Sequence, residues 1–212
     1  MARAVPSVFA PVFMTEASKT HYQNRIQEID RQPDLVGGII FIGDDLTETA
    51  MWGVLFPDAD IRNHGIAGDT TSGVEKRLHL LTRHKPEQIY LMIGEGDGVY
   101  GRTTKDVSES VVRILVQLRK NHPTAQIFLQ TPIPRDASLL AWNQDLNTNF
   151  LHLLKQPDVK SVGIDVIDLL PAYISRNGKI KADLYKEDGA LDSHGYAVWG
   201  SILGRFVAKT IR

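Results

Sequence analysis

The chain has 212 residues, of which 42% are hydrophobic and 23% are charged, and this balance predicts one globular domain with a sizeable core. Its 24 Lys and Arg residues nearly balance its 25 Asp and Glu residues, so we expect no nucleic-acid partner and no membrane partner. The chain has no cysteine, which excludes disulfides, thiolate metal sites and a cysteine nucleophile. Cysteine usage therefore does not identify the compartment.

Residues 1–15 are interpreted as an N-terminal extension to a single domain that occupies the 1–212 chain. The extension is mildly apolar, but it has few positive charges and is interrupted by Pro6 and Pro11, so it makes a poor signal peptide. No apolar run reaches the roughly 18 to 20 residues that span a bilayer, so we expect a soluble chain.

Helical and strand patterns alternate along the rest of the sequence. In chain order the sequence predicts helix 17–30, strand 38–43, helix 46–55, a weaker strand 59–64, helix 72–84, strand 88–94, helix 104–121, strand 125–131, helix 138–155, strand 161–167 and helix 196–211. The strand runs are apolar and β-branched, as in strands buried on both faces. This order predicts an α/β fold, a three-layer α/β/α sandwich with a flavodoxin-like, largely parallel sheet and a ligand site at the carboxyl ends of its strands.

Four segments of the sequence match, in order, the motifs of a known family. FIGDDLTE at 41–48 resembles the GDS(L/I)T block of the SGNH, or GDSL-type, hydrolases, and NHGIAGDTTSGV at 63–74 resembles the block with their oxyanion-hole glycine. IYLMIGEGDG at 89–98 resembles their GxND block, and DGALDSHGYAVWG at 188–200 resembles the block with the catalytic acid and base. The overall pattern is closest to the platelet-activating-factor-acetylhydrolase-like and bacterial acylesterase branch.

The resemblance implies an ester hydrolase in which a serine attacks the carbonyl, a histidine takes its proton and an aspartate orients the histidine. Backbone N–H groups and an asparagine amide hold the oxyanion. Carried over by position, the chain keeps the oxyanion-hole glycine as Gly68 and the orienting acid as Asp188. The flanking acids are also kept, as Asp44, Asp69 and Asp97.

Three positions depart from the family pattern. The serine position is Asp45, the asparagine position is Gly96, and the position three residues after Asp188, where histidine belongs, is Leu191. Gly195 and Tyr196 also stand one residue closer to the aspartate than is usual, so the histidine was either replaced or deleted. The three changed positions are those of the nucleophile, the oxyanion donor and the base. We therefore predict no ordinary serine esterase activity.

Asp45 has a structural interpretation as well as a chemical one. It stands where a helix should begin, with Glu48 three residues later, so its carboxylate is expected to cap the helix in a capping-box pattern. The helix dipole and the cap hydrogen bonds would favour the ionised form, which makes Asp45 a weak proton acceptor.

Glu95 stands between two glycines of the loop Gly94–Gly98. If it faces the vacated site, the charge of Asp45 and the apolar Leu191 would both raise its pKa, as a general base requires. The alternative is an acid that points to solvent from a flexible glycine loop.

Further residues are candidates for the site, and each has a packing alternative. Trp142, Tyr100 and Leu191 could form an apolar slot, although packing is the commoner fate of such aromatic residues. His64 could point into the site, but packing or backbone hydrogen bonding is favoured, and His194 is expected to be a surface or capping residue. Trp52 and Trp199 are expected to pack helices against the sheet.

No cofactor or metal is predicted. The glycines at 94–98 do not fit G-x-G-x-x-G, and the acids among them would repel a phosphate. Asp44, Asp45, Glu95 and Asp97 carry the oxygen ligands that hard cations prefer, but they lack the alternating spacing of a ligand loop.

Three functions remain open. The first is a pseudoenzyme that binds a small molecule, in the pocket at the strand carboxyl ends, or a protein partner. The second is a re-purposed site, natural or engineered, in which Glu95 or Asp45 acts as a general base for proton abstraction or elimination. The third is residual hydrolysis of the esterase or lipase type. The sequence does not identify the ligand, the oligomeric state or the compartment.

Overall fold

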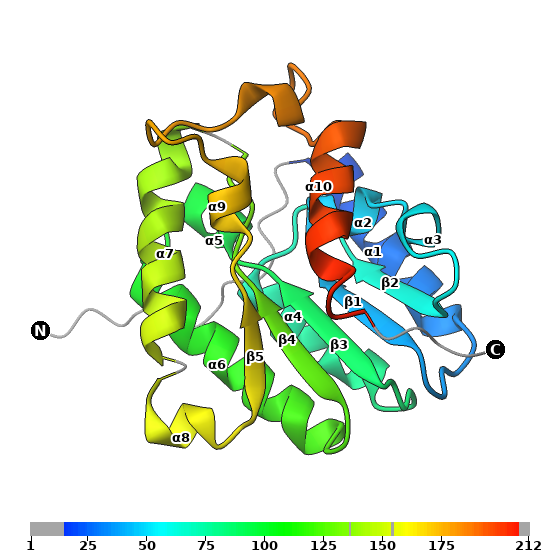
Figure 1. The fold of residues 1–212 in the computed structure, drawn as a ribbon. Coiled ribbons are helices and arrows are strands. Elements are labelled where there is room, and N and C mark those ends of the chain that lie inside the picture. Colours follow the sequence, from blue (N-terminus) through cyan, green and yellow to red (C-terminus); the bar gives the residue numbers. More distant parts are fainter. Residues whose placement is uncertain (1–14, 136, 154, 208–212) are drawn as a thin grey trace, which may run out of the picture.

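The computed structural model describes residues 15–135, 137–153 and 155–207 (Figure 1). Most of the predicted N-terminal extension and the last residues of the predicted C-terminal helix lie outside these ranges. Within them, no helix combines the length and the apolar character needed to cross a bilayer.

The centre of the fold is a five-stranded parallel sheet. Its strands are β1 (Ile39–Gly43), β2 (Ile61–Gly65), β3 (Gln88–Met92), β4 (Gln126–Gln130) and β5 (Ile164–Ile167). They lie in the order β2-β1-β3-β4-β5, and every neighbouring pair is parallel. The predicted α/β fold with a parallel sheet is confirmed, including the weaker second strand.

Helices cover both faces of this sheet (Figure 1). The α-helices are α1 (Glu16–Arg31), α2 (Asp45–Thr49), α3 (Trp52–Leu55), α4 (Thr71–Arg77), α5 (Glu95–Val99), α6 (Thr104–Asn121), α7 (Leu140–Leu153), α8 (Pro157–Lys160), α9 (Leu170–Tyr173) and α10 (Ser193–Leu203), and the 3₁₀ helices are η1 (Leu78–Leu81), η2 (Ala137–Leu139) and η3 (Ala182–Leu184). The short helices α5, α8, α9 and η3 were not predicted. The last helix also begins three residues earlier than predicted and ends at Leu203.

The helix predicted over 46–55 is divided into α2 and α3. Ala50 leaves the helical conformation, with φ −63° and ψ 128°. The break brings Trp52 onto Phe41 of β1, with ring centroids 3.6 Å apart and nearly parallel planes, while the indole N–H donates to the carbonyl of Thr47. Aromatic packing against the sheet therefore overrides the local helical pattern.

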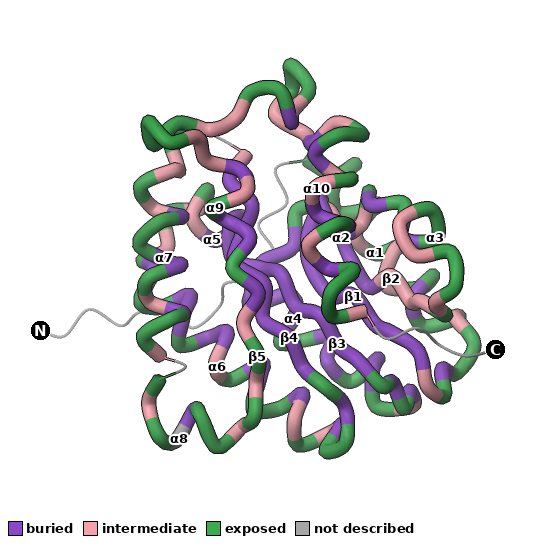
Figure 2. The backbone as a smooth tube through the Cα atoms, in the orientation of Figure 1, coloured by how far each residue is buried: buried purple, intermediate pink, exposed green. Residues whose placement is uncertain are grey.

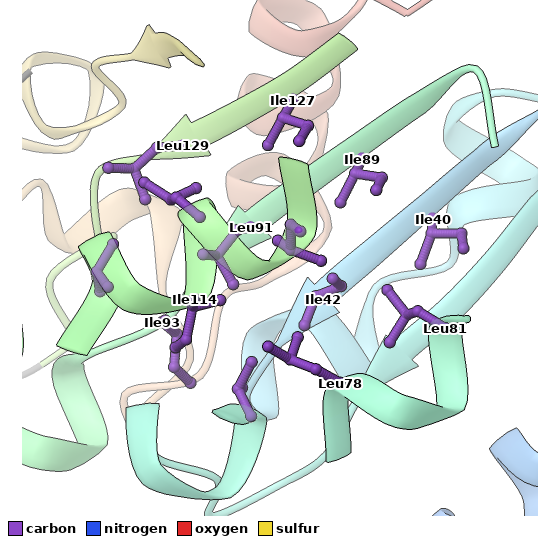
Figure 3. Packing of buried hydrophobic residues seen from close by; sticks show 14 of the residues in the cluster. Ile40, Ile42, Leu78, Leu81, Ile89, Leu91, Ile93, Ile114, Ile127 and Leu129 are labelled. Carbon is purple, nitrogen blue, oxygen red and sulfur yellow. The ribbon is translucent and has the colours of Figure 1, made fainter. Parts of the chain in front are cut away.

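The alternation of side chains along the strands gives two hydrophobic clusters, one on each face of the sheet. Figure 3 shows the first, in which strand residues such as Ile42 and Leu91 pack against Leu78, Leu81 and Ile114 of η1 and α6. The second lies on the opposite face and includes Trp52 and Trp199, as predicted for these tryptophans.

The central strands are buried along their whole length, as their apolar sequences predict (Figure 2). Strand β1 lies between β2 and β3, so the connections that leave β1 and β2 run to opposite sides of it. Such a switch in strand order opens a crevice at the carboxyl ends of the strands. The loops after β1, β2, β3 and β4 meet there and carry the predicted site.

Candidate functional site

The first site loop connects β1 to α2. Asp44 is the N-cap of α2, and its Oδ1 accepts a hydrogen bond from the backbone N–H of Leu46 at 3.3 Å. The expectation that Asp45 caps the helix is therefore wrong by one residue, since Asp45 is the first residue of the helix itself. The predicted capping box is also absent, because Glu48 instead accepts the N–H of Ala67 and lies 3.0 Å from Nε2 of His21.

Asp45 reaches across to the second site loop, which follows β2. Its Oδ2 accepts a hydrogen bond of 3.0 Å from the backbone N–H of Gly68. Gly68 has φ +77°, a backbone conformation that favours glycine and that helps to turn this N–H toward the start of α2. The glycine that the family resemblance assigns to the oxyanion hole is thus hydrogen-bonded to the residue at the serine position.

Glu95 is the first residue of α5 and is buried, with 3% of its surface exposed. Its Oε1 accepts from the backbone N–H of Arg135 at 2.9 Å, and its Oε2 accepts from Nε of the same arginine at 2.6 Å. The amide of Asn143 donates to Oε1 at the longer distance of 3.4 Å. The alternative in which Glu95 points to solvent from a flexible loop is therefore wrong.

Arg135 joins the two carboxylates that the sequence singled out. Its Nη1 lies 3.8 Å from Oδ2 of Asp45, while its Nε holds Glu95. Burial alone would lower the pKa of Arg135, but the carboxylates of Asp44, Glu95 and Asp45 raise it above its ordinary value. The sequence predicts a like charge and an apolar residue as the neighbours of Glu95. It does not predict the cation of Arg135.

Asp44 is the third carboxylate close to Arg135. Burial raises the pKa of Asp44 to about 7, helped by the nearby charges of Asp45 and Glu95 and opposed by Arg135. Only 4% of its surface is exposed. The sequence pattern identifies Asp44 only as a flanking acid, because its burial depends on the packed loops around it.

A surface pocket of about 470 Å³ opens beside Glu95 and Arg135. Its walls include Val99, Leu139, Glu187 and Asp188. Asp188, the predicted orienting acid, therefore reaches the same pocket as Glu95. Its Oδ1 accepts from the backbone N–H of Ala190 two residues later, a local turn bond that would also form in a protein without catalysis.

Leu191 does not face this pocket. It is 1% exposed and belongs to the hydrophobic cluster around Trp199, and a Cβ added at Gly195 would lie 2.8 Å from its Cδ2. The place that the family gives to a histidine is thus filled by core packing.

The predicted aromatic slot is not formed either. Trp142 packs against the first hydrophobic cluster and over Gly98, and its indole N–H donates to the carbonyl of Arg102 at 3.0 Å. Tyr100 is the C-cap of α5 and is partly buried. Neither ring is among the described residues that line the pocket beside Glu95.

The two histidines lie away from the pocket walls. His64 is fully buried in β2, with its ring 5.5 Å from that of His84, so its packing interpretation is favoured and its assignment to the pocket is wrong. His194 lies exposed in the first turn of α10, as expected for a surface residue, and the N-cap of that helix is Asp192.

Gly96 lies close to the second site loop. A Cβ at this position would stand 2.7 Å from the backbone carbonyl oxygen of Asp69, closer than real Cβ contacts allow. The family asparagine therefore has no room here unless the backbone shifts. The oxyanion-hole role assigned to Gly96 would rest on its backbone alone.

The remaining family acids hold the loops together. Asp69 is buried and binds Nε of Arg77 at 2.8 Å, and Asp97 accepts bonds from the backbone N–H and the hydroxyl of Thr71 and from Arg102. These bonds tie the loop after β3 to the loop after β2. Among the described residues, no group of three or more His, Asp and Glu side chains is arranged to hold a metal ion.

Comparison with known proteins agrees with this architecture. The model of the GDSL-like lipase/acylhydrolase family matches residues 41–198. The chain belongs to this family. The match covers the first three motif segments in full and the fourth as far as Val198, so the resemblance seen in the sequence is confirmed at the level of the family.

Relatives of this GDSL-family protein include the platelet-activating factor acetylhydrolase IB subunit alpha2 of Homo sapiens and of Rattus norvegicus. Each is 26% identical over 174 residues, which cover 79% of this chain and 73% of the relative. These relatives support the branch that the sequence suggested.

Solved structures support the fold. A candidate platelet activating factor from Streptococcus pneumonia superposes with a TM-score of 0.78 at 17% identity, over 91% of this chain and 95% of the other. A GDSL-like lipase from Bacteroides thetaiotaomicron gives a TM-score of 0.65 at 14% identity, over 87% and 95% of the two chains.

Proposed function

We propose that this GDSL-family chain has no serine-hydrolase activity and acts as a binding module for a small molecule at the carboxyl edge of its sheet. The observation that carries the proposal is the hydrogen bond between the Asp45 carboxylate and the Gly68 N–H. A carboxylate at this point supplies no hydroxyl nucleophile. It also engages the donor that an ester oxyanion would need.

The packing around the other two altered positions supports the same conclusion. Leu191 is built into the core and Gly96 leaves no space for a side chain. An active site that had lost only its nucleophile would be expected to keep room for its base and its amide donor. The packing at both positions is what we would expect of a chain that has lost both groups.

The pocket beside Arg135 is the proposed ligand site. Its volume of about 470 Å³ lies within the range of small-molecule sites, which is about 300 to 1,000 Å³. Val99 and Leu139 offer apolar walls, and Arg135 and Asp188 offer polar groups. This combination suits a small, partly polar ligand.

Two experiments test the proposal. A fluorophosphonate probe should leave the protein unlabelled under conditions that label an ordinary serine esterase completely. Covalent labelling at a residue of this site would overturn the proposed loss of the nucleophile.

In the second experiment, a screen of small molecules should find ligands that raise the melting temperature of the unmodified protein. Leu139→Asp should remove such a shift and Glu75→Gln, which is not among the residues that line this pocket, should not; a shift that survives Leu139→Asp would place the ligand elsewhere.

The carboxylate-base alternative is less well supported by this geometry. Glu95 is buried and already accepts two hydrogen bonds from Arg135, and Oδ2 of Asp45 accepts the Gly68 N–H and lies 3.8 Å from the same arginine, so both carboxylates are engaged by groups of the protein itself. Elimination of a benzisoxazole, measured against pH, decides between the functions. Base catalysis predicts a loss of rate in Glu95→Gln or Asp45→Asn, whereas the binding module predicts the same background rate in all three proteins. Residual hydrolysis through another constellation would show as ester turnover that the probe does not abolish.

A further inference from the structure

The proposed ligand site carries more negative charge than its arginine balances. Arg135 faces the carboxylates of Asp44, Asp45 and Glu95, and all three raise its pKa. Asp44 and Glu95 are 4% and 3% exposed, so solvent screens their charges little. Even with Asp44 protonated, the two remaining carboxylates outnumber the one guanidinium. This cluster therefore keeps a net negative charge.

Two further carboxylates line the pocket itself, those of Glu187 and Asp188. Both residues are exposed, and neither forms an ion pair within the described part of the chain. The N–H that Asp188 accepts comes from Ala190, which carries no charge. Lys186, the preceding residue, is exposed and is not one of the pocket walls. Among the described walls, Arg135 is thus the single cation beside three carboxylates.

A buried amide beside Glu95 also lacks a hydrogen-bond donor. Asn143 is 1% exposed, and its Nδ2 donates to Oε1 of Glu95. Because an ionised carboxylate only accepts hydrogen bonds, this contact fixes which end of the amide is the oxygen. That oxygen, Oδ1, has no partner among the described residues, although buried polar atoms are nearly always satisfied. The group that is missing beside Glu95 is therefore a donor.

The same pocket has an apolar part. Val99, Ala137 and Leu139 line it together with the acids, and Val99 is 57% exposed. A hydrocarbon chain that covered these side chains would remove apolar surface from water. The pocket of about 470 Å³ therefore combines an apolar wall with an excess of negative charge.

We propose that this pocket binds a primary alkylammonium ion. This ligand class rests on the binding function proposed for the pocket. The ammonium group lies among Glu95, Glu187 and Asp188 and balances their charge, while the hydrocarbon chain packs against Val99 and Leu139. A primary ammonium has three N–H donors for these acceptors, whereas a quaternary ammonium has none. An anionic ligand would increase the excess of negative charge.

Four ligands with the same six-carbon chain separate the effect of charge from that of hydrocarbon. In calorimetric titrations of the unmodified protein at constant ionic strength, hexylammonium should bind about tenfold more tightly than 1-hexanol or hexanoate. Hexyltrimethylammonium, which keeps the charge but has no N–H, should also bind more weakly than hexylammonium.

The outcomes distinguish the ligand class from the function of the pocket. Binding of hexanol or hexanoate as tight as that of hexylammonium would overturn the cationic ligand and leave a binding pocket. Equal binding of hexyltrimethylammonium would overturn the requirement for N–H donors. If none of the four binds, the alkylammonium is wrong, while the screen of small molecules still tests the binding function separately.

A double variant tests whether the charge of the pocket is what selects the ligand. Glu187→Gln with Asp188→Asn should weaken the binding of hexylammonium about three- to tenfold and leave that of hexanol unchanged. The matched control is Asp58→Asn with Glu109→Gln, which removes the same charge at two exposed positions outside the pocket walls. Equal affinities of the two double variants for hexylammonium would overturn the proposal.

Discussion

The backbone N–H of Gly68 donates a 3.0 Å hydrogen bond to the carboxylate of Asp45, so two segments that the family uses for catalysis are joined to each other. An ester oxyanion would have to compete with a carboxylate that is covalently part of the protein. The same carboxylate lies 3.8 Å from Nη1 of Arg135. Oδ2 of Asp45 is therefore already engaged by groups of the protein itself.

Restoring the nucleophile alone should not restore hydrolysis. Asp45→Ser supplies a hydroxyl and frees the Gly68 N–H, but Leu191, at the position that the family resemblance gives to the base, is packed in the core. Loss of the base from a serine triad typically removes orders of magnitude of rate. We expect hydrolysis of p-nitrophenyl acetate by the variant to stay within about tenfold of that by the unmodified protein. A much larger rate would show that another group serves as the base.

Removal of Arg135 should be costly because it leaves Glu95 buried without its cation. Arg135→Met is expected to reduce the free energy of unfolding by about 2 to 3 kcal/mol, somewhat below the usual range because a quarter of the arginine side chain is exposed. Urea unfolding measures the change. The matched control is Arg113→Met, which breaks an ion pair that is exposed on both sides and should cost less than about 1 kcal/mol.

The double variant Glu95→Gln with Arg135→Met separates pairing from packing. If the cost of Arg135→Met comes from the unpaired carboxylate, the double variant should be more stable than the sum of the two single variants predicts. Additive costs would mean that Arg135 contributes through packing alone.

The fold and the loops that carry the candidate site could be predicted because each depends on local patterns. Alternating apolar strands and amphipathic helices define the sheet and its layers, and the four motif loops follow its strands. The contacts within the site could not be predicted in the same way. Arg135 comes from the loop after β4, distant in sequence from Asp45, and only the assembled sheet brings the two together.

Two smaller errors have related causes. The choice between Asp44 and Asp45 as the cap depends on where the strand ends, and a sequence pattern locates such a boundary only to within a residue or two. The loop Gly94–Gly98 has weak helix propensity, yet it forms one helical turn because Asp97 and Glu95 are both anchored by bonds to other elements. Tertiary contacts therefore decide its conformation.

Asp44 should make stability depend on pH in a defined direction. Its folded pKa of about 7 lies above the ordinary value of 3.8, so the folded state binds the proton more tightly than the unfolded state. The stabilisation is fully present below about pH 4 and is lost as the pH rises to about 7. Asp44→Asn keeps a side chain that caps helices well and cannot ionise.

The variant should therefore gain stability relative to the unmodified protein between about pH 4 and 7, by an amount on the order of a few kcal/mol. Denaturant unfolding at a series of pH values measures the difference. Asp183→Asn, an exposed aspartate on η3, is the control and should show no such trend. A constant difference between Asp44→Asn and the unmodified protein at all pH values would refute the raised pKa.

Rebuilding the amide donor of the family should meet a steric barrier. In Gly96→Asn the new Cβ would stand 2.7 Å from the carbonyl oxygen of Asp69, and a backbone atom cannot move aside as a flexible side chain can. Overpacking of this kind costs about 1 to 3 kcal/mol. Gly53→Asn is the matched control, since no atom lies within 4 Å of the added Cβ at that exposed glycine. Two results together would contradict the adaptation inferred from Gly96 and Leu191. Gly96→Asn would be as stable as Gly53→Asn, and its combination with Asp45→Ser and Leu191→His would hydrolyse esters. The fold would then have kept the geometry that catalysis needs.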